Sequence, residues 1–277
     1  MLTGAARLAG VIGWPIAHSR SPRLHGHWLE RYGIDGAYLP LPVEPARLAE
    51  ALTGLQAVGF RGVNVTVPYK EAVLPFCQSL SEAAAAIGAV NTLSFTEQGL
   101  HGDNSDAFGF IENLRAKQPN WALTGKTCLV LGAGGSARAV VWGLLNAGAG
   151  KVIITNRTQA RAESLAEALD ASVCPWEARC DQLSGCDLLV NSTSLGMAGQ
   201  APLEIDLRAL PDNALVADLV YAPLETDLLQ AAASRGLGVV AGIGMLLHQA
   251  RPGFAAWFGH EPVVDAVLEA AVLADAG

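Results

Sequence analysis

The stretch LVLGAGGSARAV, residues 129–140, decides the fold class of this chain. An apolar run that is typical of a buried strand leads into glycines and then into a helical pattern. Gly132, Gly134 and Ala137 form the pattern GxGxxA: the first glycine allows a tight turn, the second lets backbone approach a pyrophosphate, and the alanine keeps helix and strand close. The stretch therefore predicts a dinucleotide-binding unit, although a plain glycine-rich turn would look the same.

The end of the next strand, KVIITN, distinguishes between two cofactors. An acidic residue there would accept hydrogen bonds from an adenosine ribose with a free 2′-hydroxyl, but the sequence continues as NRTQAR. Asn156 is neutral, and Arg157 and Arg161 supply two guanidinium groups suited to one phosphate. We expect NADP rather than NAD; two solvated arginines at an ordinary helix start are the alternative.

The strand and helix patterns predict two α/β domains. In residues 107–242, five short apolar runs alternate with helical patterns, which is typical of a Rossmann-like, doubly wound parallel sheet. Residues 1–106 read as strands alternating with helices near 22–33, 45–57 and 70–77, followed by a hairpin that turns at Gly99. From residue 243 the pattern is helical and fits either an extension of the second domain or a return to the first.

Composition excludes several classes of protein. Hydrophobic residues make up 51% of the 277 residues and charged residues 16%, which suits compact α/β domains rather than disorder. The formal net charge of −8 is spread along the chain, so we expect no binding to nucleic acid or to membrane surfaces. The five cysteines lack zinc-like spacing and no long apolar run occurs, so we expect reduced thiols, no metal and a cytoplasmic protein.

Polar residues at predicted strand ends of the first domain are candidates for a substrate site. In NVTVPYK, residues 64–70, Pro68 ends a strand and Lys70 follows where ligands bind in α/β sheets, although an ordinary solvated lysine fits as well. The hairpin supplies Asn91 and Asp106, and a lysine beside an aspartate can deliver a proton.

The stretch GWPIAHSRSPRLH, residues 13–25, adds hydroxyl groups to these candidates. Ser19 and Ser21 stand before Pro22 and a helix, which is an ordinary helix-capping start. Hydroxyls and N–H groups at a helix start also bind a carboxylate, so capping and binding are compatible.

Together these stretches resemble the shikimate dehydrogenase family along nearly the whole chain. The similar segments are GWPIAHSRSP, NVTVPYK, GAVNTL, GDNSD, GAGGSARA, NRT, NSTSLGM, DLVYAPLET and GIGMLLHQA. The resemblance implies reversible NADP-linked reduction of 3-dehydroshikimate to shikimate, a step toward chorismate and the aromatic amino acids. It also implies that residues 243–277 return to the first domain.

The resemblance implies a role for each matching residue. It makes Lys70 and Asp106 the catalytic pair, and the carboxylate is held by Ser19 and Ser21. The ring contacts are Thr66, Asn91, Tyr221 and Gln249. The cofactor contacts are Gly132, Ala133, Gly134, Gly135, Ser136, Ala137, Asn156, Arg157, Thr158, Arg161, Thr193, Gly242 and Met245.

Two positions depart from the family pattern and keep other functions open. Gly26 stands where the family usually has Asn, and Ser105 where it usually has Thr. The alternatives are a relative that uses NAD and accepts quinate, and a sensor that binds NADP without turnover. We also expect a small-molecule substrate and a homodimer.

Overall fold

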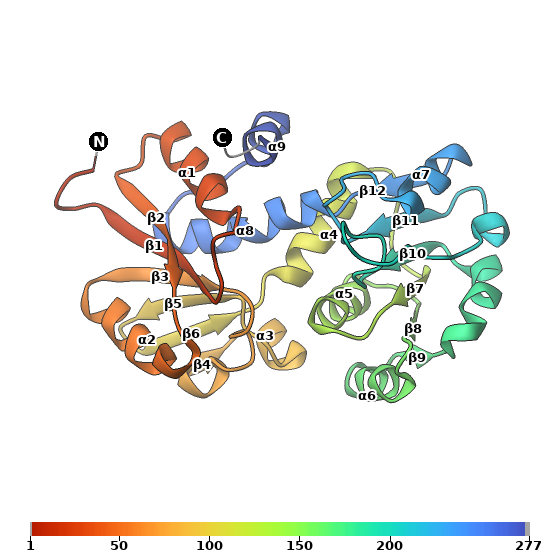
Figure 1. Cartoon of the computed structure of the whole chain (residues 1–277), viewed down its shortest axis with the longest axis horizontal. Coiled ribbons are helices and arrows are strands. Elements are labelled where there is room, and N and C mark those ends of the chain that lie inside the picture. Colours follow the sequence, from red (N-terminus) through yellow and green to blue (C-terminus); the bar gives the residue numbers. More distant parts are fainter. Residues whose placement is uncertain (1, 275–277) are drawn as a thin grey trace. The chain divides into compact units, whose positions relative to one another are not determined.

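The computed structural model describes residues 2–274, which form two compact units. Unit 1 runs through Ser105 and resumes at Gln249, and unit 2 runs from Asp106 to His248. Figure 1 shows that each unit is a sheet flanked by helices, which confirms the predicted α/β class. In the described part of the chain, no helix combines the length and the apolar character that crossing a membrane requires.

Unit 1 contains a six-stranded mixed sheet in the order β2-β1-β3-β5-β6-β4. Strands β1, β2 and β3 are parallel, and β5 and β6 form the predicted antiparallel hairpin, with Gly99 at a φ of +112° in its turn. The strands are β1 (Arg7–Gly13), β2 (Gly36–Pro42), β3 (Phe60–Val65), β4 (Ser79–Leu80), β5 (Thr92–Thr96) and β6 (Gly99–Asp103).

Helices cover both faces of this sheet (Figure 1). One face packs apolar side chains such as Ile12, Val63 and Leu93 against Leu52 of α2. The other packs against aromatic side chains, among them Trp28 of α1 and Trp257 of α8. The helices are α1 (Ser21–Arg31), α2 (Leu48–Ala57), α3 (Glu82–Ile87), α8 (Ile243–Phe258), α9 (Ala266–Leu273) and the 3₁₀ turns η1 (Pro45–Arg47) and η2 (Leu74–Phe76).

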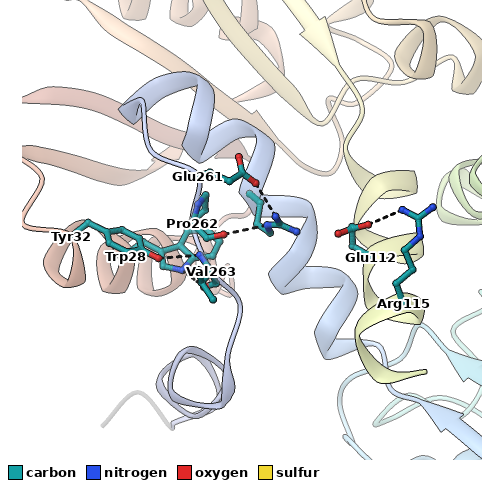
Figure 2. Close-up of polar contacts among 8 residues, drawn as sticks. Trp28, Tyr32, Glu112, Arg115, Glu261, Pro262 and Val263 are labelled. Atoms are coloured by element: carbon teal, nitrogen blue, oxygen red, sulfur yellow. Dashed lines mark hydrogen bonds and ion pairs between the residues drawn. The ribbon is translucent and has the colours of Figure 1, made fainter. Parts of the chain in front are cut away.

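Polar contacts hold residues 261–263, between α8 and α9, onto α1 (Figure 2). The backbone of Val263 accepts a hydrogen bond from Trp28 Nε1 at 3.0 Å and donates one to the Tyr32 hydroxyl at 3.0 Å. Arg251 of α8 donates to the Pro262 carbonyl and pairs with Glu261 at 2.8 Å. These bonds attach the end of the chain to the first helix of unit 1.

Unit 2 contains a six-stranded parallel sheet in the order β12-β11-β10-β7-β8-β9, which confirms the predicted Rossmann-like sheet. Its strands are β7 (Thr127–Leu131), β8 (Lys151–Thr155), β9 (Ser172–Val173), β10 (Leu188–Asn191), β11 (Leu215–Asp218) and β12 (Gly238–Val240). The strand order reverses between β7 and β10, and ligands bind beside such a switch point in α/β sheets.

The helices of unit 2 pack on both faces of its sheet. Val130 and Val140 belong to one core and Leu129 and Leu189 to the other, as the alternation of side chains along buried strands requires. The helices are α4 (Asp106–Lys117), α5 (Gly135–Asn146), α6 (Gln159–Leu169), α7 (Asp227–Ser234) and the 3₁₀ segments η3 (Trp176–Gly185) and η4 (Leu207–Ala209).

One predicted helix is wrong. Residues 70–77 form turns and the short 3₁₀ segment η2 instead of an α-helix. Pro75 cannot donate inside a helix, and the carbonyl of Lys70, which would accept the first helical bond, accepts from Val90 N–H at 2.7 Å. The backbone of Lys70 is therefore held by the segment that precedes β5 and not by a helix of its own.

Candidate functional site

Four polar segments meet at one edge of the unit 1 sheet. β1 ends at Gly13 and β3 at Val65, while β5 is antiparallel to β3 and so begins beside the end of β3. The segment that contains Asn91 therefore lies at the same edge as the segments that follow β1, β3 and β6. Thr66 N–H donates to the carbonyl of Ile12 at 3.1 Å, which joins the first two of these segments.

Asn91 is the centre of this edge. Its side chain is buried, and its Oδ1 accepts hydrogen bonds from Thr92 Oγ1 at 2.9 Å, from Ser105 N–H at 2.9 Å and from Ser105 Oγ at 3.1 Å. Because the Ser105 N–H can only donate, the amide orientation of Asn91 is fixed. The Nδ2 donor therefore points away from the Ser105 N–H.

The serine segment reaches the same edge from the start of α1. Arg20 occupies the N-cap position and no side chain caps the helix, so the ordinary capping interpretation of the two serines is wrong. Ser19 Oγ instead accepts a hydrogen bond from Ser21 N–H at 3.3 Å, and both serines are half-buried. Lys70 and Thr66 are also half-buried, after the end of β3.

The structure adds polar residues that the sequence did not indicate. The Tyr38 hydroxyl donates to Asn64 Oδ1 at 2.6 Å, and Asn64 Nδ2 donates to the Asn91 carbonyl at 3.1 Å. Burial raises the pKa of Tyr38, so its hydroxyl stays protonated, and the Ser21 side chain partly offsets this shift. The available signal was the polar Asn64 within an apolar strand.

The predicted glycine loop of unit 2 has the backbone geometry that the GxGxxA pattern predicts. Gly132 follows β7 with a φ of +111°, and a Cβ there would lie 2.7 Å from Ser192 Oγ, beyond the end of β10. A Cβ at Gly134 or Gly135 would meet no atom within 4 Å, so a ligand can approach the backbone at the start of α5. Ala133 is half-buried, Ser136 is exposed and Ala137 is buried against the sheet.

The predicted phosphate contacts follow β8. Arg157 and Arg161 are exposed, the first in the loop and the second in the first turn of α6. Asn156 Nδ2 donates to the Thr158 carbonyl at 2.9 Å, which shapes the loop before the helix. Two cations and a helix start thus lie together at the carboxyl end of β8, an arrangement that attracts a phosphate group.

A buried carboxylate supports the loops after β10 and β11. Asp218 accepts hydrogen bonds from Asn191 Nδ2, Val220 N–H and Thr226 Oγ1 at 2.7–3.0 Å. Burial nevertheless raises the pKa of Asp218 above its usual value. Asn191 Oδ1 in turn accepts from the N–H and the hydroxyl of Thr193, so this predicted cofactor contact is rigidly held.

The remaining predicted residues lie at other places in the two units. Tyr221 is 38% exposed in the loop after β11. Gly242 precedes α8 and packs directly on the backbone of Leu219, and Met245 is buried in the first turn of α8. Asp106 is the first residue of α4 and is buried, and Gln249 is half-buried where α8 joins unit 1.

Three family models match the chain. They are the shikimate dehydrogenase substrate binding domain over residues 11–93, shikimate/quinate 5-dehydrogenase over residues 114–198, and the shikimate 5′-dehydrogenase C-terminal domain over residues 242–272. The matches cover segments of both units.

Relatives match the chain over nearly its full length. The shikimate dehydrogenase (NADP(+)) of Rhodospirillum rubrum is 57% identical and is covered to 99%, as is this chain. The Thermus thermophilus shikimate 5-dehydrogenase, solved with NADP(H) and shikimate, is 38% identical with a TM-score of 0.85, covering 96% of this chain and 98% of that one.

A quinate dehydrogenase has the same fold. The Corynebacterium glutamicum enzyme, solved with NAD, is 31% identical with a TM-score of 0.89, covering 97% of this chain and 99% of that one. The predicted resemblance is confirmed by the family models and by the relatives together. This chain belongs to the shikimate dehydrogenase family.

Proposed function

We propose that this chain catalyses the reversible NADP-linked reduction of 3-dehydroshikimate to shikimate, a step toward chorismate and the aromatic amino acids. The observation that carries the proposal is the pair of polar strand edges. The edge of unit 1 contains hydroxyl groups, the Asn91 amide and Lys70. The edge of unit 2 contains a glycine loop and two arginines. These edges suit a small hydroxylated acid and a phosphorylated dinucleotide, the ligands named for the Thermus thermophilus enzyme.

The substrate binds mainly to a substrate domain, which we assign to residues 1–106 with 243–277 and which contains unit 1. The hydroxyls of Ser19 and Ser21 bind its carboxylate, because they stand at the start of a helix, where backbone N–H groups and hydroxyls together attract an anion. Asn91 donates to a ring oxygen through the Nδ2 whose direction Ser105 fixes. Thr66, Tyr221 and Gln249 complete the ring contacts.

Lys70 and Asp106 handle the proton. The Lys70 ammonium gives one proton to the carbonyl oxygen that becomes the product hydroxyl, and takes it back in the reverse reaction. The Asp106 carboxylate stabilises that ammonium. Asn91 supports this pairing, because its neighbour Val90 binds the Lys70 carbonyl and its own side chain binds Ser105, the residue before Asp106. General acid catalysis of this kind contributes about 10² to 10⁴ in rate.

NADP binds mainly to a cofactor domain, which we assign to residues 107–242 and which lies within unit 2. The fit rests on the open space over Gly134 and Gly135 and on the cations after β8. Residues 132–137 bind the pyrophosphate, and Asn156, Arg157, Thr158 and Arg161 bind the 2′-phosphate. Thr193, Gly242 and Met245 lie against the nicotinamide. When bound, NADPH supplies the hydride that the carbonyl carbon accepts.

Steady-state rates with NADP and NAD, each measured with shikimate and with quinate, test the proposal. We expect kcat/KM to be highest for NADP with shikimate, because two arginines and no acidic residue follow β8. Faster turnover of quinate with NAD would favour the quinate-type relative. Thermal stabilisation by both ligands without any change in nicotinamide absorbance would favour a sensor.

We also infer a cytoplasmic homodimer. The outer edge of β2 has no strand partner among the described residues, and beside it lies a groove of about 540 Å³ that Trp14, Leu41 and Val58 help to line. Arg47 and Glu50 line the same groove, so two copies related by a two-fold axis can pair opposite charges. Light scattering should give twice the chain mass, falling to one on Val58→Glu; a monomeric wild type would refute the dimer.

The five free cysteines suit a reducing compartment such as the cytoplasm, which cell fractionation tests.

A further inference from the structure

Asn113 lies in unit 2 on the helix that begins with Asp106. It follows Asp106 by seven residues, or two turns of α4, and therefore lies on the same face of that helix. Its side chain is only 2% exposed. The helix is itself firmly seated, because Gly143 of α5 packs against the backbone and Cβ of Ala107. The backbone from which the Asn113 side chain extends is therefore held in place.

From this position Asn113 binds the segment that leads into α8. Its Nδ2 donates to the Ala241 carbonyl at 2.9 Å. The next residue, Gly242, is pressed against the backbone of Leu219, where a Cβ would lie 2.3 Å from the carbonyl oxygen. At Gly244 a Cβ would lie 1.9 Å from Asn113 Oδ1, so only glycine fits opposite this side chain. The start of α8 is thus held between Asn113 and β11.

Stability alone does not account for an asparagine here. Its Oδ1 is buried without a hydrogen-bond partner, and a buried unsatisfied acceptor costs about 1–3 kcal/mol. An apolar side chain would avoid that cost but could not bind the Ala241 carbonyl. What asparagine adds is a directed bond to the segment that contains Gly242 and Met245.

We propose that Asn113 is a positioning residue that fixes the nicotinamide-contacting segment, Gly242 to Met245, relative to the catalytic carboxylate of Asp106. The inference rests on the proposed function, because that function assigns the roles of these groups. It adds that one side chain sets the distance between the proton-handling end of α4 and the cofactor-contacting end of α8. Asn113 itself touches neither substrate nor cofactor.

Kinetics of Asn113→Ala test this role. With NADPH and 3-dehydroshikimate, we expect kcat to fall at least tenfold and the KM for 3-dehydroshikimate to stay within twofold. The deuterium isotope effect with C4-deuterated NADPH should rise, because hydride transfer becomes slower relative to product release. Asn146→Ala is the matched control, since Asn146 also donates to a backbone carbonyl at 2.9 Å, within α5. Wild-type kcat and isotope effect in Asn113→Ala would overturn the proposal.

A second variant covers the outcome in which loss of Asn113 impairs folding. Gly244→Ala crowds the same contact from the α8 side, and we expect the double variant with Asn113→Ala to recover part of the lost kcat, because the new Cβ enters the vacated space. A double variant no better than the product of the single effects would refute the contact's role. If Lys70→Ala leaves kcat unchanged, the proposed proton pair fails; if Lys70→Ala lowers kcat and Asn113→Ala does not, only the positioning role fails.

Discussion

Each unit buries an asparagine at its candidate binding edge, but the two are surrounded differently. In unit 1 the side-chain oxygen of Asn91 accepts from neutral groups, the hydroxyl of Thr92 and the backbone and hydroxyl of Ser105. Asn191 in unit 2 donates instead to Asp218, a carboxylate that is 1% exposed. The same residue type thus accepts hydrogen bonds from neutral groups in one unit and donates to a carboxylate in the other.

The difference shows how each unit tolerates buried polarity. Unit 2 keeps a carboxylate in its core because three donors reach it, and burial still raises its pKa. Unit 1 buries a base instead of an acid: the His25 ring is stacked on Tyr38, with 3.9 Å between the ring centres. Burial lowers the pKa of His25 to about 3, and the Asn64 side chain partly offsets this shift. Both groups make the units respond differently to substitution and to pH.

The largest expected loss of stability follows removal of the unit 2 carboxylate. Asp218→Ala should lower the unfolding free energy of unit 2 by about 3 kcal/mol, because Asn191, Val220 and Thr226 then keep buried donors without an acceptor. Hydrogen exchange of the β10 and β11 amides measures this loss. If exchange of these amides is accelerated by the equivalent of less than about 1 kcal/mol relative to unit 1, the carboxylate is dispensable.

The next effect is a pH dependence confined to unit 1. Between pH 7.5 and 5 we expect His25 to remove about 2 kcal/mol of stability. Its folded pKa of about 3 lies below the ordinary value of 6.5, so the unfolded chain binds more protons over this range and stability falls as pH falls. His25→Phe, which keeps the stack on Tyr38, should flatten urea-unfolding profiles of unit 1 across this range. Identical slopes in wild type and variant would contradict the assignment.

The smallest effect compares one helix glycine from each unit. Gly26 in α1 faces open space, whereas Gly143 in α5 would place a Cβ 3.3 Å from Ala107 of α4. Gly26→Ala should therefore stabilise the protein by up to about 1 kcal/mol and raise its melting temperature. Gly143→Ala should lower the melting temperature. If Gly26→Ala destabilises the protein, that helix position has a packing role that its surroundings do not indicate.

The sequence predicted best what is local in the chain. The glycine loop and the arginines after β8 could be predicted because strand, turn and helix follow one another within a few residues. The hairpin of β5 and β6 was predictable for the same reason. The helix at 70–77 was predicted wrongly because the apolar pattern does not show which backbone groups are already bound. Val90 N–H binds the Lys70 carbonyl, which would accept the first hydrogen bond of such a helix.

What the sequence could not predict depends on contacts between distant residues. Tyr38 and Asn64 are separated by 26 residues and Asn113 and Ala241 by 128, and neither bond leaves a periodic pattern in the sequence. The short strands β4 and β9, of two residues each, and helix α3 were missed because they are too short to show a period. The residue roles, the domain boundaries, the dimer and the cellular compartment stay predictions.

The most direct test of the central claim is kcat of Lys70→Ala at saturating shikimate and NADP, read together with the dissociation constant for shikimate. We predict that kcat falls about 10² to 10⁴-fold, because the variant has no group to take the proton from the substrate hydroxyl as the hydride leaves. We predict that shikimate binding barely changes, because the serines and Asn91 remain in place. A kcat within twofold of the wild type would contradict the assignment of Lys70 as the residue that exchanges this proton.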